Sequence, residues 1–191
     1  AVGAMTIASS VMQLLSTLFL GFSQGASPII SFNYGAGQSD RVKQAVRLLV
    51  TCALSISVAF WLLLELFPGV FVLIFNDDPE LVEYGTWALR VYGAGLFAIG
   101  LQHACQQSFV ALGQAKISLF LALLRKFILL IPLILILPRF LSDQVFAVFL
   151  AEPVADLLAA ATTGMLFLIR LPKILAQRAA ALRENGGNAS I

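Results

Sequence analysis

Apolar residues run along this chain in five long stretches, separated by connections that hold many of its charged side chains. The stretches occupy residues 1–34, 48–75, 86–112, 117–138 and 145–169. Because about 20 apolar residues in a helix span the roughly 30 Å hydrocarbon core of a bilayer, each stretch is long enough to cross a membrane once. Each has little of the polar face that a helix on a soluble domain carries. The pattern predicts an all-α, polytopic membrane protein with five transmembrane helices.

Composition supports this prediction. Of the 191 residues, 60% are hydrophobic and 12% are charged, and the mean hydropathy is +0.93, far from the values of a soluble domain. A net charge of +2 is too small to indicate a nucleic-acid partner. Residue 1 is an alanine inside an apolar stretch with no signal-peptide pattern, so we expect the sequence to be the C-terminal piece of a longer polypeptide. Cys52 and Cys105 fall within predicted spans and are expected to be unpaired packing residues.

Lysine and arginine are concentrated in alternate connections. Eight of them follow the first, third and fifth stretches, at Arg41, Lys43, Arg47, Lys116, Arg170, Lys173, Arg178 and Arg183. On the other side Arg139 is the only base close to a span end, and the acidic connection 76–85 has none. Because cytoplasmic flanks carry the excess of bases, we predict a cytoplasmic C-terminus in the inner or plasma membrane.

Residues 172–191 are expected to form a basic cytoplasmic tail that is frayed over 185–191. A spacing of five between Lys173, Arg178 and Arg183 spreads these bases around a helix. That spread favours a tail that fixes orientation over a helix that lies on an anionic inner leaflet.

Glycine and proline are expected to interrupt several helices. The first stretch would be about 50 Å long as one helix, so we expect a break within residues 21–28, where two glycines and Pro28 lie beside polar side chains. Such a break either borders a transporter's substrate site or serves packing only. Pro132 and Pro153 are expected to interrupt the fourth and fifth helices. Small residues of the third stretch should let a neighbouring helix approach closely, namely Gly93, Gly95 and Gly100.

Two carboxylates lie one helical turn apart within the fifth stretch, Glu152 and Asp156. Charged side chains near the bilayer centre cost about 2.5 to 3.5 kcal/mol each, so both should face protein or water. Two acids this close in a poorly solvated place cannot both ionise cheaply, and such a pair can hold a proton or release it to bind a cation. They are therefore candidates for ion coupling. The alternative is that each pairs with a base on a neighbouring helix and serves assembly only.

Three bases at membrane depth are candidate charge partners, Arg90, Arg125 and Lys126. Arg90, about one turn into the third stretch, is the predicted partner of Glu152. For Arg125 and Lys126, either the fourth helix protrudes into the cytoplasm or the two bases line a cytoplasmic vestibule. Starting that helix at Phe127 would leave about 12 apolar residues, around 18 Å, which is too short to span and favours the vestibule.

The third stretch also carries four polar side chains within an arc of about 140°, at Gln102, His103, Gln106 and Gln107. Such an arc faces a cavity or another polar helix. His103 is interpreted as a hydrogen-bonded structural histidine, with a proton relay as the alternative. No second His or Cys lies at ligand spacing and no enzyme signature is present, so we expect no metal site, no cofactor and no enzymatic activity.

The run GFSQGASPIISFNYGAG at residues 21–37 resembles a signature of multidrug and toxic compound extrusion (MATE) transporters. Further matches follow in order at FVALGQAK (109–116), LRK (124–126), IPL (131–133) and AEPVAD (151–156). Together they are similar to the bacterial drug-efflux branch of that family, over essentially residues 1–170.

The resemblance implies twelve helices in two six-helix lobes that export organic, often cationic compounds in exchange for H⁺ or Na⁺. Residues 1–171 would then be helices eight to twelve of a secondary antiporter that works by alternating access. Its partners would be membrane lipid, small organic substrates and the N-terminal lobe of the same polypeptide. Ser23, Gln24 and Asn33 would border the cavity with the polar arc and the carboxylate pair. Coupling carboxylates that many members place in the N-terminal lobe are not transferred to Glu152 or Asp156.

Two alternatives remain open from the residues. A lipid-linked oligosaccharide flippase has a similar architecture but should have a more basic cavity, and Arg90, Arg125 and Lys126 leave that question open. A non-transporting membrane scaffold would use the charged residues for assembly only.

Overall fold

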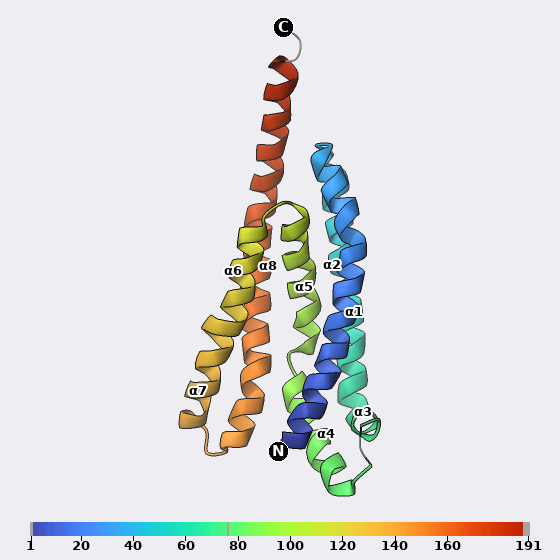
Figure 1. Ribbon diagram of the computed structural model, residues 1–191, viewed down its shortest axis with the longest axis vertical. Coiled ribbons are helices and arrows are strands. Elements are labelled where there is room, and N and C mark those ends of the chain that lie inside the picture. The colour runs from blue at the N-terminus through green and yellow to red at the C-terminus, as the bar shows by residue number, and fades with distance from the viewer. Residues whose placement is uncertain (1, 76, 189–191) are drawn as a thin grey trace.

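The computed structural model describes residues 2–75 and 77–188, and they form a bundle of long helices lying side by side (Figure 1). None of these residues lies in a strand. The elements in chain order are α1 (Val2–Gly35), α2 (Ser39–Leu66), α3 (Pro68–Leu73), α4 (Pro79–Gly93), α5 (Leu96–Ala111), α6 (Ala115–Leu123), the π-helical turn η1 (Leu124–Leu130), α7 (Ile131–Phe140) and α8 (Gln144–Asn188). The predicted all-α fold is confirmed.

Four helical segments are long and apolar enough to cross a membrane, namely Gly3–Gly35, Ser39–Leu66, Ala115–Phe140 and Gln144–Glu184. They correspond to the first, second, fourth and fifth predicted stretches. The third predicted crossing is present as two helices of 15 and 16 residues, α4 and α5, separated by a turn at Ala94 and Gly95.

Helix α1 continues through residues 21–28 without interruption, with Pro28 inside it, so the break predicted there is wrong. A proline removes one backbone hydrogen bond, and a long apolar helix retains the remaining bonds on both sides of it. Pro153 likewise lies inside the continuous helix α8 and does not break it. The prolines in these two helices therefore produce no gap that could form a binding site.

The fourth crossing is interrupted, as predicted from Pro132. The turn η1 comes directly before this proline, and the amide of Ile131 donates to the carbonyl of Lys126, five residues back. Because Pro132 has no amide hydrogen to donate to Ile128, the usual ladder cannot continue through this position. The chain instead forms one wide turn, a feature that is frequent at functional sites.

The turn between α4 and α5 lies against α8 at a point where only glycine fits. A Cβ atom on Gly95 would lie 2.9 Å from both Cα and the carbonyl oxygen of Pro153. A Cβ on Gly93 would lie 2.8 Å from the side chain of Leu64 in α2. The close approach predicted for the glycines of this stretch is confirmed, and it fixes α4 and α5 between α2 and α8.

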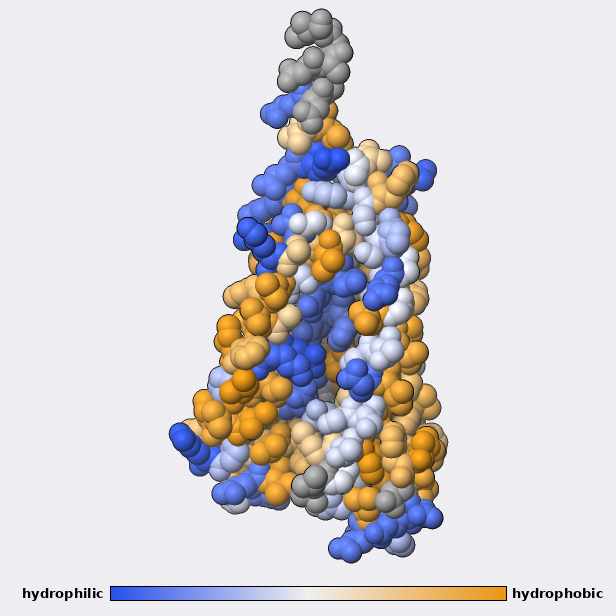
Figure 2. All heavy atoms as spheres, viewed as in Figure 1, coloured by the Kyte–Doolittle hydropathy of each residue, from blue (hydrophilic) through white to orange (hydrophobic). Residues whose placement is uncertain are grey.

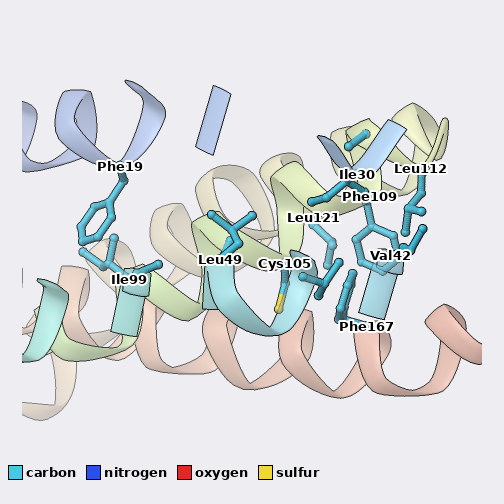
Figure 3. Close-up of a cluster of buried hydrophobic side chains, with 14 of the residues drawn as sticks. Phe19, Ile30, Val42, Leu49, Ile99, Cys105, Phe109, Leu112, Leu121 and Phe167 are labelled. Carbon is cyan, nitrogen blue, oxygen red and sulfur yellow. The ribbon is translucent and has the colours of Figure 1, made fainter. Parts of the chain in front are cut away.

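Helix α5 lies at the centre of the bundle and contacts α1, α2, α6 and α8. The main cluster of buried side chains surrounds it (Figure 3). Phe109 of α5 packs edge to face on Phe167 of α8, with ring centroids 5.0 Å apart. Cys105 is buried in this cluster, Cys52 is half-buried, and both are free thiols, as predicted.

Helix α8 runs through residue 171 without a boundary and projects beyond the other helices as a straight continuation (Figure 1). Arg178 in this extension donates from Nε to the carbonyl of Tyr34 at 3.3 Å and from Nη2 to that of Gly35 at 2.7 Å. It thereby satisfies carbonyls at the C-terminal end of α1 that have no partner within their own helix. The chain is still helical at Asn188, and the later residues of the predicted frayed segment lie outside the described part.

Candidate functional site

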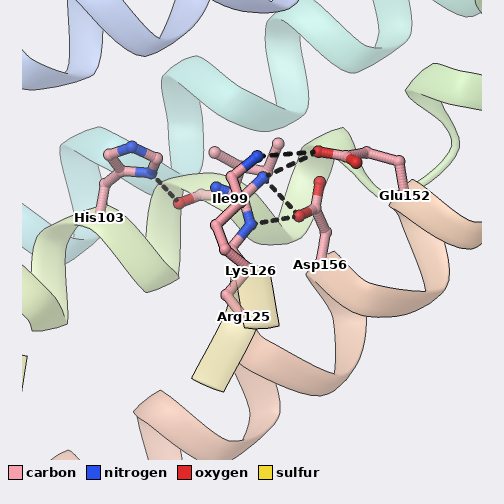
Figure 4. A network of polar contacts seen from close by, with 6 residues as sticks. All are labelled: Ile99, His103, Arg125, Lys126, Glu152 and Asp156. Atoms are coloured by element: carbon pink, nitrogen blue, oxygen red, sulfur yellow. Dashed lines mark hydrogen bonds and ion pairs between the residues drawn. The ribbon is translucent and has the colours of Figure 1, made fainter. Parts of the chain in front are cut away.

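Four charged side chains meet where η1 faces α8 (Figure 4). Arg125 donates from Nε to Oδ1 of Asp156 at 2.6 Å, and its Nη2 lies 2.5 Å from the same oxygen. The same Nη2 lies 3.5 Å from Oε1 of Glu152. Lys126 reaches that Glu152 oxygen with Nζ at 3.7 Å. Arg125 therefore bridges both acids, and Lys126 adds a second, looser contact to Glu152 alone.

Burial falls in steps across this cluster. The Asp156 side chain is 4% exposed, those of Glu152 and Arg125 are 15% and 17% exposed, and that of Lys126 is 56% exposed. Two bases and two acids sum to zero charge when all are ionised, which keeps the desolvation cost of the buried members tolerable. The Glu152–Lys126 side of the cluster is the side that reaches solvent.

The two consecutive bases that reach Glu152 both lie in the π-helical turn η1. In an α-helix, neighbouring side chains point about 100° apart. A turn closed by bonds to the fifth residue back holds slightly more residues, so this angle is somewhat smaller, and the long side chains of Arg125 and Lys126 both extend to Glu152. The i, i+4 spacing of Glu152 and Asp156 places both acids on one face of α8, as predicted, and that face meets the two bases.

Arg90 does not pair with Glu152, so that predicted partnership is wrong. Its Nη2 donates to the backbone carbonyl of Glu65 in α2 at 3.3 Å, and the residue is exposed. The prediction assumed one straight helix from residue 86 to 112. The turn at Gly95 separates α4 from α5, and Arg90 ends up on the side of α4 that faces α2.

The polar arc of α5 is divided among different neighbours. The Gln102 side chain is buried, and its Oε1 has no hydrogen-bond partner among the described residues. His103 is half-buried, donates from Nδ1 to the carbonyl of Ile99 at 3.1 Å, and stacks on Phe19 of α1. Gln106 donates to the carbonyl of Ser118 at 3.4 Å, and Gln107 is half-buried. The four side chains therefore do not line one common cavity.

The predicted cavity residues of α1 also point in different directions. Ser23 is buried, and its hydroxyl has no partner among the described residues. Gln24 is exposed, whereas the Asn33 side chain donates to the carbonyl of Ile29 at 2.7 Å. Only Gln24 of the three is freely presented at the surface.

A polar stripe near the start of α1 was not predicted. It lines a hollow of about 530 Å³ together with Met5, and it consists of Thr6, Ser9, Ser10 and Gln13. The spacing of three or four residues marks one helix face, so this pattern was readable from the sequence. Figure 2 shows hydrophilic side chains gathered in a hollowed area between α1 and the α6–α7 segment, amid a largely apolar outer surface.

Among the described residues, no group of three or more His, Cys, Asp and Glu side chains could hold a metal ion. Glu152 Oε1 is within 4 Å of two cationic groups, Nη2 of Arg125 and Nζ of Lys126.

Comparisons with known proteins agree on one family. The MatE family model matches residues 1–136. The FAD transporter of Shewanella oneidensis is 27% identical over 158 residues, covering 83% of this chain and 34% of that protein. The multidrug export protein MepA of Staphylococcus haemolyticus is 23% identical over 162 residues, covering 83% of this chain and 35% of its own. The chain thus spans about a third of the length of these curated relatives.

Solved structures give the same result. The MATE multidrug transporter DinF-BH superposes with a TM-score of 0.78 at 32% identity, covering 91% of this chain and 38% of that one. A MATE crystal structure in the bent conformation reaches a TM-score of 0.85 at 17% identity, covering 93% of this chain and 39% of that one.

Proposed function

This chain belongs to the MatE family of multi-pass membrane transporters, and on that premise we propose that it forms most of one lobe of a secondary active multidrug efflux antiporter. The antiporter exports organic, cationic compounds in exchange for H⁺ or Na⁺ by alternating access. The lobe lies in the inner or plasma membrane with its C-terminus in the cytoplasm, the side that carries the excess of lysine and arginine.

The observation that carries this proposal is the graded charge cluster at the π-helical turn. A buried ion pair that served assembly alone would need only Arg125 and Asp156. Here a second acid and a second base extend the pair towards the exposed side of the cluster, where Lys126 is 56% exposed, and we propose that protons and cations reach Glu152 from that side. Ionisable groups at membrane depth that remain accessible in this way are typical of proton relays and coupling sites.

Coupling at Glu152 follows from competition for one carboxylate. As an anion, Glu152 attracts Lys126 or the positive group of a substrate. Once Glu152 binds a proton, that attraction is lost and the cation is released, while Arg125 remains paired with Asp156. Because proton and cation exclude each other at the same oxygen, the uptake of one drives the release of the other, as antiport requires.

The arrangement supports H⁺ over Na⁺ as the coupling ion. A bound Na⁺ would need several oxygen ligands, and both carboxylates are already in contact with Arg125. The cation would therefore have to displace a guanidinium group from the cluster, whereas a proton needs one oxygen of Glu152 only.

The test is efflux by the full-length transporter in proteoliposomes with an imposed pH gradient. We expect Glu152→Gln to abolish gradient-driven export of a cationic dye, while the matched control Glu65→Gln, at the end of α2 away from the cluster, retains it. One relative is a FAD transporter, so a flavin nucleotide belongs in the substrate panel. Full gradient-driven export by Glu152→Gln would contradict coupling at this residue, and full export by Asp156→Asn as well would favour the scaffold alternative. Lipid-linked oligosaccharide translocation without dye export would favour the flippase.

A further inference from the structure

A second concave surface lies between α2, α5 and α8, apart from the charge cluster. It is a groove of about 840 Å³, and two bases, Lys43 and Arg47, belong to its lining. Its remaining walls are largely apolar and include Val50, Leu101, Met165 and Leu168. We propose that this groove binds an anionic phospholipid, with an acyl chain in the apolar part and the phosphate group on Lys43 and Arg47.

The length of the groove matches one leaflet. Its wall on α8 extends from Ala160 to Leu171, which is about 16 Å along the helix axis. Half of the hydrocarbon core of a bilayer measures roughly 15 Å. A chain lying along this wall therefore reaches from the headgroup level to the bilayer midplane.

The bases lie at the correct end of the groove. Helices α2 and α8 pack on α5 and run in opposite directions, so the first turns of α2 lie at the same end of the bundle as the later part of α8 (Figure 1). Lys43 and Arg47 of α2 are therefore near Leu171, and the apolar end of the groove is near Ala160. This end of the bundle carries most of its lysine and arginine residues, and basic pockets between helices on the cytoplasmic side are typical sites for anionic headgroups.

Small side chains create the depth of the groove. Its α8 wall includes Ala160, Ala161 and Gly164. A Cβ atom on Gly164 would lie 3.3 Å from Cδ2 of Leu101, so the wall is already in contact with α5 behind it. A bulky residue at this face would project into the space that the acyl chain fills.

Charge distinguishes this surface from ordinary lipid-facing surface. The groove lining contains two bases and no carboxylate among the described residues. Lys43 contacts Asp40 at 3.4 Å, but both side chains are largely exposed, so that contact is weak. Arg47 is exposed and forms no ion pair among the described residues, and its planar guanidinium suits a phosphate oxygen pair. A neutral lipid would gain the apolar contacts alone.

The experiment compares lipids on the purified, delipidated full-length transporter by native mass spectrometry and thermal unfolding. Phosphatidylglycerol should remain bound and raise the unfolding temperature more than phosphatidylcholine does. The double variant Lys43→Gln/Arg47→Gln should weaken phosphatidylglycerol binding by about tenfold or more. The matched control Arg41→Gln/Arg183→Gln removes two bases of the same end outside the groove and should leave binding unchanged. Ala161→Trp, which fills the groove, should lower binding while retaining both bases.

Several results would overturn the proposal. Equal binding of the two lipids, or equal losses of phosphatidylglycerol binding in the test and control variants, would show that the groove contacts lipid without preference for an anionic headgroup. Protection by inorganic phosphate alone would assign the bases to a soluble anion. A wild-type protein that binds no lipid here would indicate that another segment of the transporter covers the groove. Glu152→Gln should retain lipid binding, so failure of this site and failure of the coupling proposal are separable.

Discussion

Replacing Arg125 with glutamine should destabilise this lobe more than replacing its partner Asp156 with asparagine. Arg125 is the only described base that contacts Asp156, which is 3% exposed. In the Arg125→Gln variant, Lys126 is therefore the one described base left beside the two acids, and it contacts only Glu152, so Asp156 loses its counter-charge. The Asp156→Asn variant instead leaves Arg125 with Glu152 still 3.5 Å away, so its positive charge keeps a counter-charge.

The magnitudes follow from the short distance and the burial. Unit charges 2.6 Å apart attract by roughly 6 kcal/mol at an effective dielectric constant near 20. Desolvation offsets much of this attraction, and removing one partner of a buried pair typically costs 3 to 5 kcal/mol. We expect a loss of about 3 kcal/mol in the free energy of unfolding for Arg125→Gln and a loss of about 1 kcal/mol for Asp156→Asn. The double variant should be more stable than Arg125→Gln, with a coupling energy of about 2 kcal/mol.

The assay is a double-mutant cycle on the full-length protein, measured as detergent-denaturant unfolding midpoints. Arg139→Gln, which removes an exposed base from the last turn of α7, is the control and should change stability little. Additive losses in the double variant would refute the reasoning, because they require that the two charges do not stabilise each other. Equal losses in the two single variants would refute the argument that Glu152 compensates the charge of Arg125 when Asp156 is replaced.

Two further predictions concern packing and helix ends. Gly95→Ala should lower the free energy of unfolding by about 1 to 3 kcal/mol, because its Cβ would overlap the backbone of Pro153. The control is Gly21→Ala, which has no atom within 4 Å of its Cβ and should cost no stability in the same unfolding assay. Equal effects of the two substitutions would contradict the packing argument. Arg178→Ala should destabilise by about 1 kcal/mol and increase proteolysis at the end of α1. The Gly35 carbonyl loses the side-chain donor of Arg178, and the Tyr34 carbonyl keeps only the amide of Gly37. The exposed base Arg183 replaced by alanine is the control, and an identical change there would exclude the capping role.

The membrane-crossing helices and the acid pair could be predicted because both depend on local properties of the sequence. An apolar run of about 20 residues specifies a span wherever it occurs. A spacing of four residues puts two side chains on one helix face in any α-helix. Glu152 and Asp156 accordingly meet the same guanidinium group.

The identity of the basic partners could not be predicted, because it depends on the rotation of one helix against another. Arg125 and Lys126 lie in the wide turn before Pro132 and both reach Glu152 with their long side chains, an arrangement that the spacing of the residues alone does not specify. Pro132 removes one hydrogen bond from the ladder at this position, but Pro28 and Pro153 do the same in helices that stay regular, so proline alone did not specify the wide turn.

The sequence predicted a break in α1 near Pro28 and a continuous third crossing, and the structure shows the reverse. Pro28 leaves α1 continuous, whereas the third crossing divides at Gly95. Proline changes one hydrogen bond in a helix whose other turns remain intact. The close approach at Gly95 was predicted from the glycine itself, but its neighbour, the backbone of Pro153, and the turn that divides α4 from α5 depend on long-range packing.

Because α8 is one continuous helix, it connects the charge cluster directly to the contact between Arg178 and the end of α1. Asp156 and Arg178 are 22 residues apart on this one helix, a lever arm of about 33 Å. A swing of roughly 5° about Asp156 would displace Arg178 by about 3 Å, the full length of the bonds that tie it to the end of α1. If a change of protonation at Glu152 tilted α8 by this angle, Arg178 would lose its hydrogen bonds to the carbonyls of Tyr34 and Gly35, and α1 and α8 would separate at this end of the lobe.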